Sequence, residues 1–147
     1  MENKRSDHDA EMLRDIYKDC RMGAGSTVKL AGNTENESMR QLMNGQLKQY
    51  QGFAARAADL LAERGQTPED ASFFEKLPAE IGMAVGQMTD PSDSKTAQMM
   101  INGFVMGIAE LKKQLADSPD VSEQTAALCA DMIQFQLGAM HDMEQYL

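Results

Sequence analysis

The sequence predicts an all-α protein that folds as a single domain over residues 1–147. Apolar residues recur three and four positions apart in successive segments, as on one face of an α-helix, and no segment alternates with period two. Aromatic residues make up 5% of the chain, with no tryptophan, whereas methionine occurs 13 times. Because β-sheets depend on β-branched and aromatic residues, a core of Leu, Met, Ile and Ala favours helices.

The first helix is expected over residues 9–31, after a loose N-terminus at residues 1–8. The sequence GNT at 32–34 ends it. Its inner face is expected to hold Leu13, Ile16, Tyr17, Cys20, Ala24, Thr27 and Leu30.

The second helix is expected over residues 35–64. Thr34 and Glu37 have the spacing of a capping box, in which both side chains bind free backbone N–H groups at a helix start. Gly65 stops the helix. Its inner face is expected to hold Met39, Leu42, Met43, Gln46, Tyr50, Phe53, Ala57 and Leu60.

A third helix is expected over residues 68–89, capped by Thr67, with Pro68 at its first position and Pro78 interrupting it early. Its apolar positions are Phe74, Leu77, Ile81, Ala84 and Met88. The cluster Asp90, Pro91 and Asp93 indicates the start of another helix.

Two further helices complete the chain, over residues 92–116 and 119–146. Ser118 and Pro119 mark the start of the last helix. The inner positions of these two helices are Ala97, Met100, Ile101, Phe104, Ile108, Leu111 and Leu115, then Leu128, Met132, Phe135, Ala139, Met143 and Tyr146.

The lengths of the connections predict the topology. Short joints at 32–34 and 117–118 make two antiparallel hairpins, and the long stretch 65–92 lies between them. A helix in that stretch spans roughly 20 Å and carries the chain back along the bundle. This arrangement resembles the ferritin-like superfamily, an antiparallel four-helix bundle with a crossover segment. Residues 22–61 and 80–110 are also similar to small, uncharacterised bacterial ferritin-like proteins. The alternative topology is an up-and-down bundle of five helices.

The resemblance implies two metal ions between the helices, but the sequence departs from the ligand pattern. Iron and manganese proteins of this type use inward-pointing Glu residues and Glu-x-x-His pairs. No histidine stands three residues after a glutamate, and the chain has only His8 and His141. The acids are expected to lie beside the apolar faces rather than within them: Glu11, Asp15, Asp19, Glu110, Asp131 and Glu144. We therefore assign no catalytic, cofactor-binding or metal-binding residue.

Gln46 and Tyr50 are the polar side chains expected on the buried face of the second helix. They form either a hydrogen-bond network that fixes helix register or the remains of a lost metal site, and both interpretations stay open. His141 and Glu144 are expected to be a solvated pair near the C-terminus.

Methionines and glycines recur together in GMAVGQM (82–88) and QMMINGFVMGI (98–108). Thioethers can bind Cu(I), but methionines spread over nearly every helix favour core packing. Gly82 with Gly86, and Gly103 with Gly107, make flat strips that let helices approach closely, within the chain or across a homodimer.

The composition restricts the partners. A net charge of −9 disfavours nucleic acids and anionic membranes, and no apolar run has the length of a membrane span or signal peptide, so we expect a cytoplasmic protein. Cys20 and Cys129 are expected to be buried free thiols. We therefore expect a structural or protein-interaction module, forming a homodimer or binding an unknown protein, without cofactor or enzyme activity. The alternatives are a divergent iron, manganese or copper protein, or a binder of an apolar ligand beneath Ala54, Ala57 and Ala58.

Overall fold

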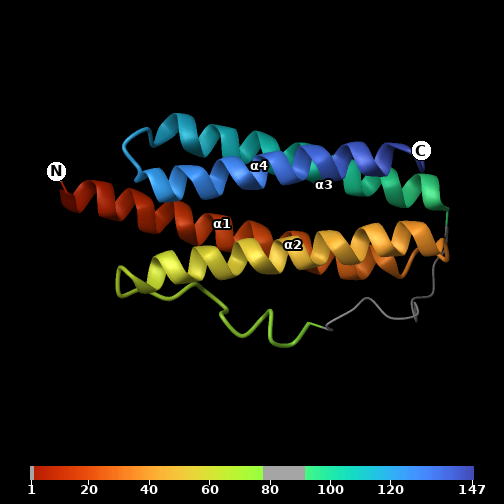
Figure 1. The fold of residues 1–147 in the computed structure, drawn as a ribbon, viewed down its shortest axis with the longest axis horizontal. Coiled ribbons are helices and arrows are strands. Elements are labelled where there is room, and N and C mark those ends of the chain that lie inside the picture. The colour runs from red at the N-terminus through yellow and green to blue at the C-terminus, as the bar shows by residue number, and fades with distance from the viewer. Residues whose placement is uncertain (1, 78–91) are drawn as a thin grey trace.

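The computed structural model describes residues 2–77 and 92–147, with side chains from residue 7 onward. Within those ranges the chain forms four α-helices and no strand (Figure 1). They are α1 (Glu2–Ala31), α2 (Glu37–Ala62), α3 (Asp93–Asp117) and α4 (Glu123–Glu144). The predicted all-α class is therefore confirmed, and the helices pack as a four-helix bundle. Across the described residues, no helix is long and apolar enough to cross a membrane.

The four helices form two antiparallel hairpins, α1 with α2 and α3 with α4 (Figure 1). The chain crosses from one end of the bundle to the other between the hairpins, so that α2 and α3 run in the same direction. At each end of the bundle, one polar contact joins the two hairpins. Thr34, in the α1–α2 joint, donates a hydrogen bond to Asp93 at the start of α3. At the other end, the Asp9 carboxylate accepts a hydrogen bond from the backbone N–H of Ser122, 2.7 Å away.

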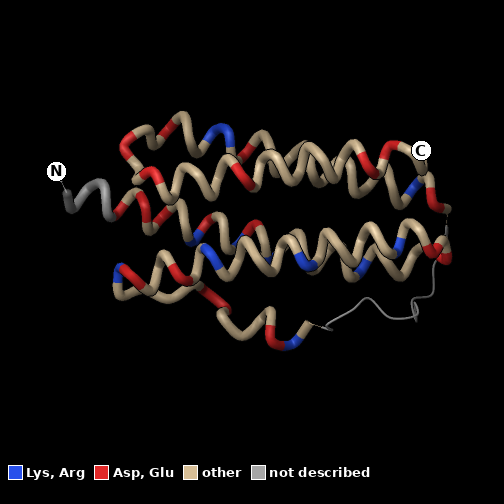
Figure 2. Tube along the Cα trace, viewed as in Figure 1, with Lys and Arg blue, Asp and Glu red and all other residues tan. Residues whose placement is uncertain are grey.

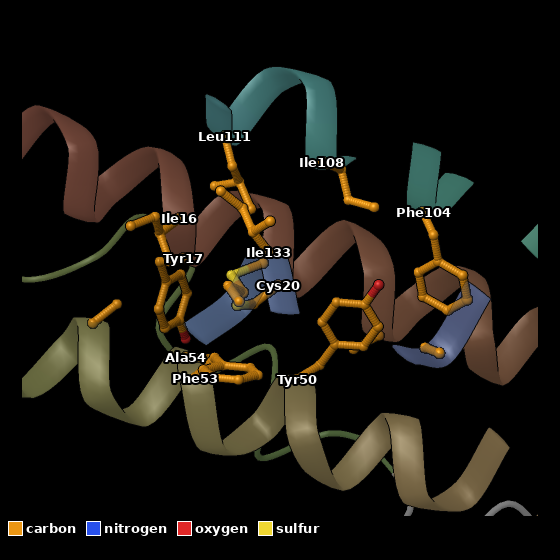
Figure 3. Close-up of a cluster of buried hydrophobic side chains, with 14 of the residues drawn as sticks. Ile16, Tyr17, Cys20, Tyr50, Phe53, Ala54, Phe104, Ile108, Leu111 and Ile133 are labelled. Carbon is orange, nitrogen blue, oxygen red and sulfur yellow. The ribbon is translucent and has the colours of Figure 1, made fainter. Parts of the chain in front are cut away.

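The core lies between the helices along their predicted inner faces. Every position predicted for the inner face of the first helix is buried. The largest fully buried hydrophobic side chains come from all four helices and include Leu13, Ile16, Met39, Met43, Leu47, Leu61, Leu111, Leu128, Met132 and Met143. Figure 3 shows part of this core, with side chains from α1, α2, α3 and α4 meeting around Cys20.

The helix predicted over residues 68–89 is wrong for its described part. Residues 69–77 form successive turns and bends instead, and residues 78–89 lie outside the described residues. Asp70 has a φ of 56°, a left-handed conformation that an α-helix does not contain. Its carboxylate accepts a hydrogen bond from Arg21 on α1 at 3.3 Å, and Phe74 packs edge-on against Tyr17. Side-chain contacts therefore hold this segment against α1, while its backbone forms turns, as in the hydrogen bond from Phe73 N–H to the Asp70 carbonyl.

Residues 2–8 of the predicted loose N-terminus (1–8) are helical, because α1 begins at Glu2; residue 1 lies outside the described residues. Asp9 helps to fix this part of α1, because its side chain is buried and each of its carboxylate oxygens accepts a hydrogen bond. One accepts the Ser122 N–H, and the other accepts a hydrogen bond from Arg64 at 3.0 Å. His8 lies beside it and contacts Asp120 at 2.8 Å. These contacts join the N-terminal part of α1 to the residue Arg64 after α2 and to the joint between α3 and α4.

The predicted capping residues of two helices are also wrong. Asn36, not Thr34, caps α2, since its side chain accepts the N–H of Met39 at 3.1 Å. Ser122 caps α4 and accepts the N–H of Thr125, so that this helix starts four residues later than predicted. Near each start, several Ser, Thr and Asn residues could serve as the cap, and tertiary contacts decide among them.

Candidate functional site

A cleft of about 340 Å³ lies between α1 and α3, which belong to different hairpins. Residues of α1 form one wall and residues of α3 form the other, while Tyr50 from α2 and Gln136 from α4 reach the cleft from the second half of each hairpin. This volume lies within the range of small-molecule binding sites. The cleft is therefore the candidate functional site.

Three glycines shape the cleft. A Cβ atom at Gly103 would meet no atom within 4 Å, so this position opens directly onto free space. A Cβ at Gly23 would stand 2.8 Å from the Tyr50 hydroxyl oxygen, and a Cβ at Gly107 would stand 2.6 Å from Oε1 of Gln136. Gly23 and Gly107 thus make room for two polar side chains that come from the opposite helices. The predicted strip of Gly103 and Gly107 lines this cleft, whereas Gly82 and Gly86 lie outside the described residues.

Gln136 brings an unmatched hydrogen-bond acceptor to the cleft. Its side chain is only 3% exposed, and Oε1 has no hydrogen-bond partner among the described residues. An unpaired buried polar group costs about 1–3 kcal/mol. A ligand bound in the cleft that carries a hydrogen-bond donor would satisfy Oε1 of Gln136.

Asp19, expected beside the apolar face of α1, is partly buried there. Its Oδ2 has no solvent contact and no hydrogen-bond partner among the described residues. Burial, reinforced by the charges of Glu110 and Asp15 and opposed by Lys18, raises the pKa of Asp19 from 3.8 to about 7. Asp19 and Glu110 both line the cleft, one from each wall. The cleft therefore carries negative charge, part of it poorly solvated.

Tyr50 connects the cleft with the aromatic part of the core. Its ring packs edge-on against Phe135 with centroids 5.1 Å apart. In Figure 3 it rises from α2 with its hydroxyl directed toward α3. Burial raises the pKa of the Tyr50 hydroxyl, which therefore stays protonated at neutral pH. It can donate or accept a hydrogen bond at the cleft.

The mouth of the cleft is apolar and includes exposed methionines. Met22, Met99 and Met106 are 59%, 47% and 72% exposed. Residues 96–109 of α3 carry no charged side chain, and the middle of the layer formed by α3 and α4 is largely tan in Figure 2. Among the described residues that line the cleft, none is a lysine, arginine or histidine. The cleft thus combines apolar walls with hydroxyl, amide and carboxylate groups, and its charged side chains are acidic.

The remaining polar residues of the sequence prediction lie apart from this chemistry. Gln46 is buried as predicted, but neither amide atom has a hydrogen-bond partner among the described residues, so the expected network through Gln46 does not form. His141 lies 3.5 Å from Glu144 on the surface, as predicted. In the described part of the chain, no three His, Cys, Asp or Glu side chains are placed to share a metal ion.

Both cysteines are buried free thiols, as predicted. Cys20 Sγ lies 3.7 Å from the Met132 sulfur, and Cys129 donates to the carbonyl of Leu111. Burial raises the pKa of the Cys20 thiol far above neutrality and that of Cys129 to about 11. Thiols with such pKa values are poor nucleophiles at neutral pH.

The sequence matches no model of a known protein family, and comparisons with curated proteins and with solved structures found no match.

Proposed function

We propose that this protein is a non-catalytic binding module, built on a ferritin-like bundle, that takes its ligand in the cleft between α1 and α3. The topology supports the ferritin-like part of the proposal. Two antiparallel hairpins are joined so that α2 and α3 run in the same direction, which a simple up-and-down succession of helices does not produce. The ligand-binding part is carried by the cleft itself.

The observation that carries the proposal is the pairing of an open apolar cleft with unmatched polar groups at its base. Gly103 leaves the cleft open, and Gln136 presents a buried amide oxygen without a partner. Binding sites of small molecules share this composition, with mostly apolar walls and a few polar groups that orient the ligand. The buried thiols have raised pKa values, and neither they nor the surface His141 form an activated nucleophile pair. Binding therefore fits the cleft better than catalysis.

The test fills the cleft without disturbing the fold. In Gly103→Leu, the new side chain starts in open space and projects into the cleft, and leucine is a better helix former than glycine. Gly52→Leu is the matched control, because Gly52 is also a helical glycine with open space around its Cβ position but lies outside the cleft. The probe is Nile red, a neutral dye whose fluorescence rises in apolar surroundings. Wild type and Gly52→Leu should bind the dye, and Gly103→Leu should not. Equal binding by all three proteins, or by none, would contradict the proposal.

A second candidate is a divergent metal-binding protein, favoured by the sulfur atoms on the rim of the cleft. Met22, Met99 and Met106 are exposed there, and thioethers bind Cu(I). Elemental analysis after incubation with iron, manganese, zinc or copper(I) salts and desalting separates the candidates. Stoichiometric copper that is lost in Met99→Leu would favour the metal protein, whereas a metal-free protein that binds Nile red favours the first proposal.

Exposed apolar residues on α3 favour self-association of the protein through this helix. Val105 and Met106 are 50% and 72% exposed on the uncharged stretch of this helix. Two copies could cover these residues in a symmetric dimer. Light scattering should then give twice the chain mass of 16.2 kDa, and Val105→Lys should return the mass to that of one chain. A single-chain mass for wild type would remove the dimer from the proposal.

A further inference from the structure

We propose that the cleft between α1 and α3 binds an organic ammonium group carried on an apolar arm. This inference rests on the proposed function and specifies its ligand. The shared chemistry belongs to free alkylamines and to lysine side chains of other proteins.

The polar groups at the base need hydrogen-bond donors. Oε1 of Gln136 and Oδ2 of Asp19 are both buried, both unpaired among the described residues, and both acceptors. Gln136 reaches the cleft because Gly107 lacks a side chain, and its amide oxygen would lie 2.6 Å from a Cβ there. An ammonium group has three donors and no acceptor, so it matches such a base directly.

The charge balance selects a cation over an anion or a neutral ligand. Glu110 adds a second carboxylate on the opposite wall from Asp19, and no described residue lining the cleft is basic. The two carboxylates repel each other, as the contribution of Glu110 to the raised pKa of Asp19 shows. A bound cation would favour ionised Asp19 and relieve this repulsion.

The walls select an organic cation over a metal ion. Hard divalent ions prefer several oxygen ligands, and the described residues offer no group of three acidic, histidine or cysteine side chains around one point. In contrast, Leu30, Phe104 and Met106 give the cleft long apolar surfaces above its polar base. An alkyl chain would lie along these surfaces while its ammonium end reaches the acceptors.

The groups that face Asp19 define how binding depends on pH. They are Asp15 and Lys18 on α1, Glu110 on α3, and the buried Cys20, Tyr50 and Cys129, which remain protonated at neutral pH. An alkylammonium group, like lysine, keeps its charge below about pH 10. Affinity should therefore fall as the pH drops from about 8 to about 6, where Asp19 takes up a proton.

The experiment compares three ligands of equal chain length by calorimetry at about pH 8: n-hexylamine, 1-hexanol and hexanoate. Hexylamine should bind at least about tenfold more tightly than hexanol, and hexanoate should bind most weakly. Equal affinities for hexylamine and hexanol would overturn the ammonium inference but leave the binding function standing. If Nile red, hexylamine and hexanol all fail to bind, the proposed function is removed as well.

Two variants locate the ammonium group. Asp19→Asn and Glu110→Gln should each reduce the preference for hexylamine over hexanol, and Asp19→Asn should also abolish its pH dependence. Asp142→Asn, on the exposed end of α4, removes the same charge outside the cleft and should leave the preference unchanged. A full preference retained in both cleft variants would overturn the assignment. Glu110 is exposed, so its variant gives a second readout if Asp19→Asn folds poorly.

The two sources of the ammonium group are separated by one more ligand. Nα-acetyl-lysine methylamide carries the same group on a four-carbon arm attached to a peptide. Binding comparable to that of hexylamine supports the inference with a protein lysine as the source. Binding of hexylamine alone supports it with a free amine as the source. Failure of both amines in a protein that binds hexanol would overturn it.

Discussion

The side-chain amide of Gln136 on α4 occupies the space that a side chain at residue 107 of α3 would need. Its Oε1 lies 2.6 Å, and its Nε2 3.0 Å, from the Cβ position of Gly107. One turn earlier on the same helix, Gly103 faces open space. The two glycines therefore have different roles: one admits a buried amide to the cleft, and the other keeps the cleft open.

These different roles predict different effects of alanine. Gly103→Ala should stabilise the protein by about 1 kcal/mol, because alanine is the better helix former and its Cβ meets nothing. Gly107→Ala should lose most of that gain, because the new Cβ must displace the Gln136 amide. Urea unfolding of the two variants measures the difference. Equal stabilisation by both would show that Gln136 does not occupy the Gly107 position.

Asp19 predicts a pH dependence of stability. The folded state raises its pKa from 3.8 to about 7, so folded protein binds a proton more tightly than unfolded protein. Its contribution to stability is therefore present in acid and is lost as the pH rises toward 7. Since the side chain is only partly buried, we expect a loss on the order of 1–2 kcal/mol between about pH 5 and pH 8.

Asp19→Asn should remove this loss, because asparagine does not titrate. The free energy of unfolding of the variant, relative to wild type, should increase from about pH 5 to pH 8 by the amount that wild type loses through Asp19. Asp142→Asn is the control and should parallel wild type at every pH. A constant difference between Asp19→Asn and wild type would mean that Asp19 titrates normally in the folded protein.

Asp9 predicts a large effect at one end of the bundle. Its carboxylate binds the Ser122 N–H and Arg64, and all of these groups are at least partly buried. Asp9→Ala should therefore destabilise the protein by about 2–4 kcal/mol, because it leaves a backbone donor and a partly buried cation unpaired. The comparison is Asp131→Ala, which breaks an exposed ion pair with Arg56 and should cost about 0.5 kcal/mol. Similar losses in thermal unfolding would refute the special role of Asp9.

Helical periodicity predicted the inner faces, because each helix buries its one apolar face whatever the positions of the neighbouring helices. The positions of Leu13, Ile16 and Cys20 on α1 and of Met132 and Met143 on α4 follow from spacing alone. Helix ends were less predictable. Thr34 and Glu37 have the spacing of a capping box, but the Thr34 hydroxyl accepts the N–H of Asn36 and donates to Asp93, a residue 59 positions away, and Asn36 is the cap. Such long-range contacts leave no local trace in the sequence.

The candidate site was only half visible in the sequence. The glycines of α3 drew attention to one wall, but Asp19 lies at the edge of the apolar stripe, where only the covering helix decides its burial. One signal was available: Asp19 and Gly23 are one turn apart on α1, as are Gly103 and Gly107 on α3. Gln136 was missed because a glutamine at helical spacing also suits a solvent-exposed face.

The most direct test of the account is a nuclear magnetic resonance titration of the isotope-labelled protein with n-hexylamine, read at the backbone amides of its 11 glycines. Glycine amides resonate in a separate region of the spectrum, and three of them, at Gly23, Gly103 and Gly107, line the cleft. We expect saturable shifts at these three amides, with small changes at Gly45, Gly52 and Gly138. Shifts spread over all glycines, or concentrated away from the cleft, would contradict it.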